Sequence, residues 1–332
     1  MAALSGVGMV QVPFQCKAGI IDPVVSNIMT GFIPTWDVAG VKDVSLAPSL
    51  IAAENDSGFY EVPFWESAIV DFKGNIYLDV SMLVGFSRIV SSGDLYGAFT
   101  SDQSGITSLS VSGNNTISDV TELINVTDLR LQGNNTVNDV TTLTKLTFLL
   151  ITGDNTISDV TPLTLLTYLR ADGDNTISDV TPLTLLRTLL ISGNNTISDI
   201  TPLVELRVLE ASGLNTISDV STLLELTVLR VQGNNTISDI SMLTNINDVR
   251  ITGQNTISVP PVFPAEMKQL FLSGGALLSA EVDSFLAALS LATSWSGSRS
   301  VALSSDADPP TAAGLAYIPV IMNNGATSVQ VN

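Results

Sequence analysis

Hydrophobic and polar positions follow a pattern that returns every twenty residues between Leu109 and Ser258. In one copy the fixed aliphatic positions are Leu166, Leu169, Ala171, Ile177, Val180 and Leu183. Alternation with a period of two at Leu169, Ala171 and Gly173 predicts a short strand over residues 167–172. A unit this short cannot bury its own apolar side chains. The copies are therefore expected to stack as the coils of a solenoid, with their strands in one parallel sheet.

Two polar columns accompany the aliphatic ones. Every copy carries Gly-x-Asn-Thr, and amides at a tight turn are expected to satisfy backbone groups that the sheet leaves unpaired. A carboxylate follows four residues after each Asn except the last, and its expected role is to cap the next turn by accepting backbone N–H groups. A row of like charges also allows cation binding, although each coil supplies only one carboxylate and no EF-hand spacing is present. The columns are Asn115, Asn135, Asn155, Asn175, Asn195, Asn215, Asn235 and Asn255, and Asp119, Asp139, Asp159, Asp179, Asp199, Asp219 and Asp239.

The pattern Leu-x-x-Leu-x-Leu-x-Gly-x-Asn-x-Ile over residues 106–259 resembles the leucine-rich repeat. This resemblance implies a curved solenoid with its sheet on the concave side. The period of twenty is short for that family, so turns or single 3₁₀ turns are expected opposite the sheet. A parallel β-helix is the alternative architecture.

Four positions in each coil are predicted to stand on the outward face of the sheet, and these positions change from copy to copy. Six of the eight arginines of the chain fall there, beside apolar and aromatic residues. Arginine and tyrosine are typical of binding hot spots, although cross-strand pairs that merely stabilise the sheet would use the same residues. The predicted ligand-binding or subunit-packing surface consists of Arg130, Phe148, Leu150, Tyr168, Arg170, Arg187, Leu190, Arg207, Glu210, Arg230 and Arg250.

The two ends differ from the repeat, which predicts three domains: residues 1–100, 101–259 and 260–332. The first is expected to be a mainly β anchoring domain, with β-like runs at Met9–Phe14, Phe59–Phe64, Ile69–Phe72, Ile76–Val80 and Phe86–Val90.

The last domain is an expected α/β cap that continues the sheet and closes the open end of the core. Its predicted strands are Leu270–Leu272, Val301–Leu303 and Val329–Val331. One predicted helix covers 280–291 and is N-capped by Ser279. A second follows Pro310-Thr311 and runs to about Met322, interrupted by Pro319. Four stretches of this domain resemble the C-terminal module of leucine-rich-repeat fibre proteins of bacteriophages: Ser279–Leu286, Trp295–Gly297, Pro310–Gly314 and Asn324–Asn332.

Composition narrows the chemistry. The chain of 332 residues carries 32 acids against 13 bases, a net charge of −19, which opposes nonspecific binding of nucleic acid. It has no histidine, so Ser-His and Cys-His catalytic dyads and metal sites with histidine ligands are excluded. Its single cysteine, Cys16, is expected to be a small buried hydrophobic residue. No apolar run reaches the length of a membrane span, and no secretion signal is recognised. Neither a metal nor another cofactor is expected.

Three functions compete at this point. The leading hypothesis is a non-enzymatic structural and recognition protein of a phage or phage-tail-like particle, a fibre or surface decoration. Its N-terminal domain would contact particle proteins, while the solenoid binds a cell-surface glycan or protein receptor. By analogy with fibres the chain would be a homo-oligomer, located on the virion or particle surface and released without a signal peptide. The alternatives are a bacterial surface adhesin of internalin-like type and a polysaccharide-cleaving spike that uses paired carboxylates.

Overall fold

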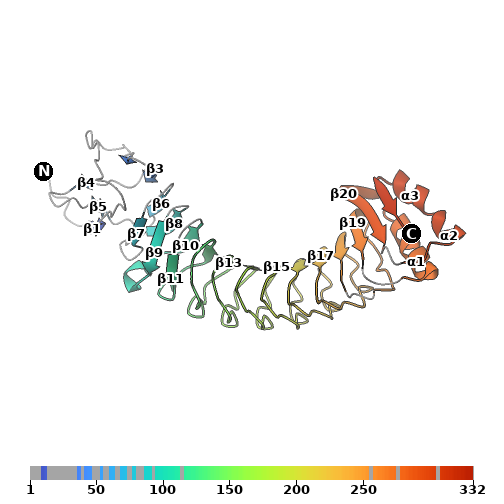
Figure 1. The fold of residues 1–332 in the computed structure, drawn as a ribbon, viewed down its shortest axis with the longest axis horizontal. Helices are drawn as coiled ribbons and strands as arrows, with labels where there is room; N and C mark the ends of the chain where they lie inside the picture. The colour runs from blue at the N-terminus through green and yellow to red at the C-terminus, as the bar shows by residue number, and fades with distance from the viewer. Residues whose placement is uncertain are drawn as a thin grey trace. The chain divides into compact units, whose positions relative to one another are not determined.

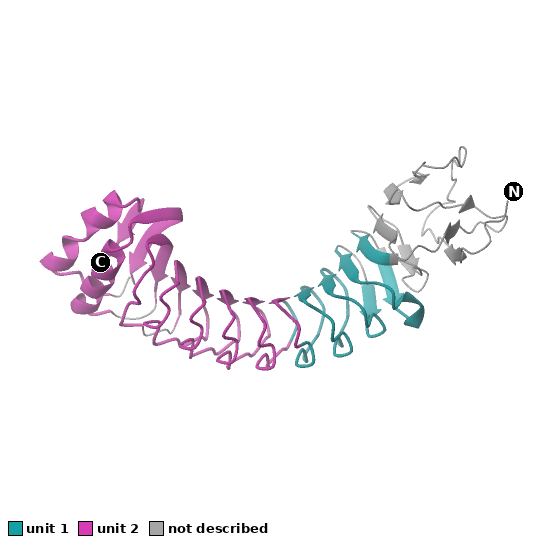
Figure 2. Ribbon diagram, turned by 180° about the vertical axis from the view of Figure 1, so that it is seen from behind, with its two compact units in different colours: residues 1–163, 173–175 teal, residues 164–172, 176–332 magenta. Residues whose placement is uncertain are grey.

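The computed structural model describes residues 87–91, 95–112, 116–253, 257–273, 277–303 and 307–331 with their side chains. Before residue 95 it otherwise describes the backbone of strands only. Figure 1 labels the elements. The chain divides into two compact units, residues 1–163 with 173–175 and residues 164–172 with 176–332 (Figure 2). The predictions on Cys16, Asn115 and Asn255 lie outside the described residues.

The first unit is built almost entirely of strands. Its main sheet has the order β2-β3-β6-β8-β10-β12-β13, parallel from β6 onward, and smaller sheets have the orders β1-β5-β4 and β11-β9-β7. All five β-like runs predicted before residue 91 coincide with strands. The elements are β1 (Met9–Val12), β2 (Trp36–Val38), β3 (Val41–Leu46), β4 (Ala53–Glu54), β5 (Tyr60–Pro63), β6 (Ala68–Phe72), β7 (Tyr77–Asp79), β8 (Phe86–Ser91), β9 (Asp94–Ala98), the 3₁₀ helix η2 (Ser101–Gln103), β10 (Ser108–Val111), β11 (Thr116–Asp119), β12 (Asp128–Leu131) and β13 (Phe148–Ile151).

The main sheet of the first unit crosses residue 100, where a domain boundary is predicted. Ser108 of β10 pairs with Arg88 of β8 and with Asp128 of β12, so the twenty-residue register already holds between β8 and β10. Strand β8 therefore belongs to the same sheet as the coils, and the three-domain division stays a prediction.

The second unit continues the same plan in a parallel sheet of order β14 to β21. Tyr168 pairs with Thr188, and the offset between neighbouring strands stays at twenty residues up to β18. The offset becomes 21 where Asp248 pairs with Gln269. The strands are β14 (Tyr168–Ala171), β15 (Thr188–Ile191), β16 (Val208–Ala211), β17 (Val228–Val231), β18 (Asp248–Ile251), β19 (Glu266–Leu272), β20 (Ser294–Leu303) and β21 (Ser328–Gln330).

The predicted aliphatic columns form the core. Leu166, Leu169, Ala171, Ile177 and Val180 are fully buried, and their counterparts in the other described coils are buried as well. Burying each aliphatic side chain contributes about 1.5–3 kcal/mol, which offsets the loss of chain entropy once neighbours cover both sides of a coil.

Opposite the sheet each described coil makes two consecutive tight turns. Leu183 N–H donates to the Val180 carbonyl at 3.0 Å, and Leu186 N–H donates to the Leu183 carbonyl at 2.9 Å. These hydrogen bonds confirm the predicted turns. A coil of twenty residues has no room for a helix at this place. From β12 to β18 each described coil has one strand of the main sheet with turns behind it, which is the leucine-rich-repeat geometry, whereas β7, β9 and β11 add a second small parallel sheet at the start of the solenoid.

Buried amides join neighbouring coils, as the sequence predicted. The Oδ1 atom of Asn235 accepts the Ile217 N–H of the preceding coil at 2.9 Å, and its Nδ2 donates to the Gln232 carbonyl at 2.8 Å. The equivalent amide–backbone bond recurs in the other described coils, from Asn135 to Asn215. All six side chains are fully buried, so this column is structural.

The C-terminal cap contains α1 (Ser279–Ser290), α2 (Ala312–Leu315) and α3 (Ile318–Asn323). The predicted N-cap of α1 was wrong: Leu278 holds that position, and the Glu281 carboxylate accepts its backbone N–H at 2.8 Å. The second predicted helix is two short ones, α2 and α3, and Pro319, which lacks an N–H, lies in the first turn of α3. No helix among the described residues is both long and apolar enough to cross a membrane.

Candidate functional site: the outward face of the sheet

The strands of the solenoid present alternate side chains to solvent. In β14, Leu169 and Ala171 are fully buried, Tyr168 is half-buried and Arg170 is exposed. Phe148 at the start of β13 is likewise half-buried on the outward side. The prediction that these variable positions face away from the core is therefore confirmed.

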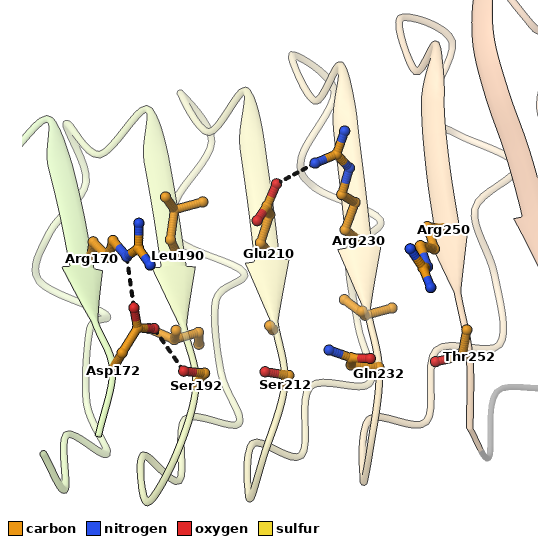
Figure 3. A pocket seen from close by; sticks show the side chains of 13 residues that line it. Arg170, Asp172, Leu190, Ser192, Glu210, Ser212, Arg230, Gln232, Arg250 and Thr252 are labelled. Carbon is orange, nitrogen blue, oxygen red and sulfur yellow. Dashed lines mark hydrogen bonds and ion pairs between the residues drawn. The ribbon is translucent and has the colours of Figure 1, made fainter. Parts of the chain in front are cut away.

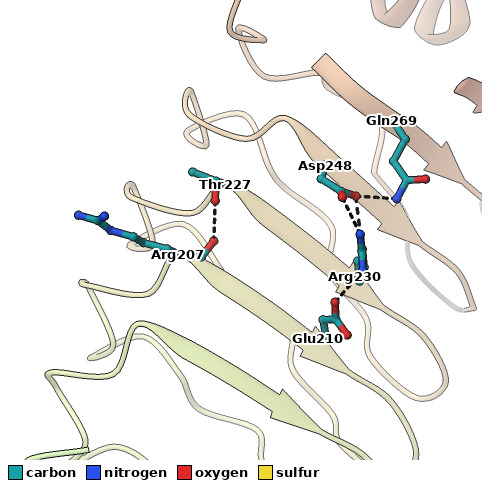
Figure 4. Close-up of polar contacts among 6 residues, drawn as sticks. All are labelled: Arg207, Glu210, Thr227, Arg230, Asp248 and Gln269. Atoms are coloured by element: carbon teal, nitrogen blue, oxygen red, sulfur yellow. Dashed lines mark hydrogen bonds and ion pairs between the residues drawn. The ribbon is translucent and has the colours of Figure 1, made fainter. Parts of the chain in front are cut away.

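Arg230 of β17 forms the centre of a cross-strand ion-pair cluster (Figure 4). Its guanidinium lies 2.8 Å from Glu210 of β16 and 2.7 Å from Asp248 of β18. Gln269 of β19 donates a further hydrogen bond to Asp248 at 2.6 Å. The hydrogen bond to Asp248, whose side chain is only 8% exposed, raises the pKa of Arg230 against the opposing effect of burial. This cluster ties four neighbouring strands together, as the sheet-stabilising interpretation predicts for Arg230.

The second unit has a groove on this face, which Arg230 lines together with a second polar group formed by Arg170 and Asp172 (Figure 3). Arg170 donates to Asp172 at 2.7 Å, and the Ser192 hydroxyl also donates to Asp172 at 2.7 Å. The hydrogen bond to Asp172 raises the pKa of Arg170. The groove has a volume of about 360 Å³ and is lined by Arg170, Leu190, Glu210, Arg230, Gln232 and Arg250 among others.

In the first unit, Arg130 is held by its own strand and the next one. Its guanidinium donates two hydrogen bonds to Asp128, at 2.9 and 3.1 Å, and lies 4.3 Å from the centre of the Phe148 ring. Cation–π packing of this kind contributes about 0.5–1 kcal/mol at exposed sites. Arg130 and Phe148 therefore form a preorganised pair on the outward face.

All four acids of this face are neutralised by three arginines, while the other arginines differ. Arg250 lies 5.4 Å from the centre of the Phe271 ring. Among the described residues, the guanidinium groups of Arg187 and Arg207 have neither an ion pair nor a hydrogen bond. Unpaired charges on a strongly acidic chain are available to a ligand.

Five of the predicted surface residues meet in the groove: Arg170, Leu190, Glu210, Arg230 and Arg250. Tyr168, Arg187 and Arg207 belong to the same unit without lining it, and Arg130, Phe148 and Leu150 belong to the first unit. Sequence reasoning missed Gln269 and Phe271, because the offset of 21 residues after Asp248 hides their alignment with the repeat.

The aspartate column caps turns, as expected. Asp179 accepts the Thr181 N–H at 2.8 Å and the Thr181 hydroxyl at 2.7 Å, and these bonds lower its pKa. The pKa of Asp139, Asp199 and Asp239 is lowered in the same way by the residue two places on. Among the described residues, no three carboxylate or cysteine side chains group in a way that could hold a metal ion.

Solved structures with similar folds come from bacteria and plants. An internalin (inlF) from Listeria monocytogenes superimposes with a TM-score of 0.52 at 22% identity, covering 80% of this chain and 86% of that one. A leucine-rich-repeat protein from Leptospira interrogans gives a TM-score of 0.54 at 16% identity, covering 76% and 68% of the two chains. This chain is a leucine-rich-repeat solenoid by fold.

The leucine-rich-repeat ectodomain of a plant membrane receptor kinase from Arabidopsis thaliana is also similar, with a TM-score of 0.51 at 14% identity. Its structure was solved in complex with Casparian strip integrity factor 2, and the likeness covers 80% of this chain but 38% of the ectodomain. No protein-family model and no curated protein matches the chain. At these identities the comparisons establish the leucine-rich-repeat fold alone.

Proposed function

We propose that the chain is a non-enzymatic recognition protein that binds its ligand on the outward face of the sheet. The observation that carries this proposal is the division between fixed inward and varied outward positions, with six of the eight arginines on the outward side. The acids of that face are already paired with arginines, and described members of the aspartate column accept hydrogen bonds from their own turns. None of them stands ready as a free general acid or base.

We further propose that the protein works on a phage or phage-tail-like particle, as a fibre or surface decoration. The C-terminal stretches that resemble fibre modules of bacteriophages support this setting, and so does a net charge of −19, which keeps particles apart in solution. Residues 1–100, which lie outside the repeat, would attach the chain to particle proteins, and the chain would act as a homo-oligomer.

A bacterial surface adhesin is the second candidate. The fold similarity to the internalin from Listeria monocytogenes favours it, and the receptor ectodomain in complex with its factor supports a protein or peptide ligand for either function. The two candidate functions use the same binding face. They differ in whether the protein belongs to a phage-like particle or to the bacterial surface.

Attachment to cells tests the binding face. The double variant Tyr168→Ala/Arg170→Glu removes a half-buried ring and inverts a charge on one strand, so binding of the purified chain to target cells should be lost. The melting temperature should stay within a few degrees, because both side chains point away from the core. Leu165→Ala is the matched control, since Leu165 is 46% exposed in the turn before the same strand. Undiminished attachment of the double variant would refute the chosen face.

The particle setting needs a separate test. Antibodies against the chain should label purified phage or tail-like particles in electron micrographs, and the chain should co-purify with them at fixed stoichiometry. Labelling of the bacterial cell envelope instead, without particles, would favour the adhesin.

A further inference from the structure

At the position just before the outward residues of each strand, four strands of the second unit carry cations. Arg207 N–H donates to the Arg187 carbonyl at 2.9 Å, and the same backbone ladder continues through Thr227 and Asn247 to Lys268. The next strand adds Arg299, which directly precedes Ser300, the partner of Gln269, and lies in a bulge of β20 opposite Lys268 with a φ of +48°. We call Arg187, Arg207, Lys268 and Arg299 the basic row.

The basic row has no internal neutralisation. Within the described part of the chain, none of its four side chains makes an ion pair or a hydrogen bond. Glu210 and Asp248 are already held by Arg230, and the exposed Glu266, two residues before Lys268, accepts a hydrogen bond from the Ser296 hydroxyl at 2.7 Å. Four unpaired cations in one row are unusual on a chain with a net charge of −19, and they do not stabilise the sheet through ion pairs.

Threonine at the same position shows what the sheet does need. The Thr227 hydroxyl donates to the Arg207 carbonyl of the preceding strand at 3.0 Å (Figure 4). Thr107, Thr127 and Thr147 make the equivalent bond at 3.0–3.1 Å. Arg187 and Arg207 give up this bond, and in Figure 4 the Arg207 side chain extends away from the ion-pair cluster. Their guanidinium groups are therefore not needed for the sheet and stay exposed.

We propose that the basic row binds the carboxylates of a linear acidic polysaccharide. This inference rests on the proposed function and specifies its ligand. The row crosses five strand-to-strand steps of about 4.8 Å each, or about 24 Å in all, with its cations on the first two and the last two strands. A linear chain of uronic acids carries a carboxylate on every sugar and can therefore meet both pairs of cations. Guanidinium groups recognise carboxylates with two parallel hydrogen bonds.

Other polyanions fit the row less well. Between the cations lie the polar residues Thr227 and Asn247, and none of these six positions is apolar or aromatic. A protein partner would be expected to bury apolar or aromatic anchors. Single-stranded nucleic acid would need rings on which its bases could stack. An acidic glycan needs only charges and hydrogen-bonding groups.

Fluorescence anisotropy with the full chain and fluorescein-labelled oligogalacturonate tests the proposal. Arg187→Thr/Arg207→Thr should raise the Kd about tenfold or more, since each charge-assisted hydrogen bond is strong, and should weaken the dependence of binding on salt. The melting temperature should not fall, because threonine is the residue of the neighbouring coils. The single variant Arg187→Thr should also raise the Kd. Its matched control is Lys145→Thr, which removes one charge outside the row and should leave the Kd unchanged.

Three outcomes would overturn the inference. They are absent binding of oligogalacturonate, unchanged binding by the double variant, and equal binding of a neutral maltodextrin of the same length. Binding of polyglutamate or oligothymidylate in place of oligogalacturonate would likewise contradict it and assign the row to a peptide or nucleic acid. Cell attachment separates this failure from that of the proposed function. If Arg187→Thr/Arg207→Thr attaches normally while Tyr168→Ala/Arg170→Glu does not, only the basic row is misassigned.

Discussion

At the scale of single residues, the repeat separates side chains that hold the coil from side chains that are free to vary. The buried asparagines belong to the first kind, because each satisfies backbone groups of two coils. The glycines do as well: Gly213 has a φ of +77°, and a Cβ there would lie 2.4 Å from the Gly193 carbonyl oxygen. Invariance of these positions is therefore explained by backbone geometry and not by a ligand.

Asn235→Ala should lower the free energy of unfolding by about 1–3 kcal/mol, because it leaves the buried Ile217 N–H without an acceptor. Urea denaturation followed by circular dichroism measures this loss. The neighbouring Asn234→Ala removes an exposed amide from the same turn and should change stability by less than about 0.5 kcal/mol. Equal effects of the two substitutions would show that the buried amide has no special role.

The residue scale also marks the limit of sequence reasoning about the site. The columns of the repeat placed Arg230, Glu210 and Asp248 on one face, as the structure confirms. Their pairing was beyond the sequence, because Arg230 reaches acids on both neighbouring strands and its choice depends on side-chain rotamers. Lys268 and Arg299 were missed, since the longer connections before β19 and β20 break the period that reveals the columns.

At the scale of elements, each coil is a strand followed by turns that its own side chains cap. Asp179 and Asp199 each accept a hydroxyl and a backbone N–H from the residue two places on, and these bonds lower their pKa. Turn formation is thus coupled to the ionised form of the carboxylate. The coupling recurs along the solenoid, so small effects of single caps add up.

The caps should make stability depend on pH in the acid range. A carboxyl group whose pKa is lowered by folding stabilises the folded state above its ordinary pKa of about 3.9, and this stabilisation disappears as the pH falls through the lowered value. In urea denaturation between pH 7 and pH 2, the triple variant Asp179→Ala/Asp199→Ala/Asp239→Ala should be less stable than the parent at neutral pH. The difference should shrink toward pH 2.

Glu205→Ala is the control, because Glu205 is an exposed carboxylate for which the described residues provide no hydrogen-bond partner. It should leave the acid-range slope as it is in the parent. A deficit of the triple variant that stays constant with pH would mean that the lost side chains, and not their charges, matter.

Elements outside the repeat were harder to predict than those inside it. Inside, seven tandem copies report the same strand and turns, so local ambiguity averages out. In the cap each element occurs once. There the N-cap of α1 was misplaced by one residue, and the helical stretch that Pro319 was expected to interrupt is two short helices, with Pro319 in the first turn of the second.

At the scale of the whole molecule, charge is the dominant property. A net charge of −19 makes the chain repel itself, while the binding surfaces proposed above depend on a minority of cations. Salt should therefore act in opposite directions on folding and on ligand binding.

Raising sodium chloride from about 10 mM to about 0.5 M shortens the Debye length from about 30 Å to a few Å and screens this repulsion. The melting temperature measured by calorimetry should rise by a few degrees, and potassium chloride should act equally. A melting temperature that falls with salt would show instead that ion pairs such as Arg230 with Asp248 outweigh the general repulsion.

The amide bonds between coils have a direction that matters while the protein is being made. In six consecutive coils, from Ile117 to Ile217, the isoleucine or valine N–H is satisfied by an asparagine eighteen residues further along, which the ribosome adds later. A nascent solenoid must therefore trail the newest segment by one coil, and its growing tip stays unfinished until translation supplies the next amide.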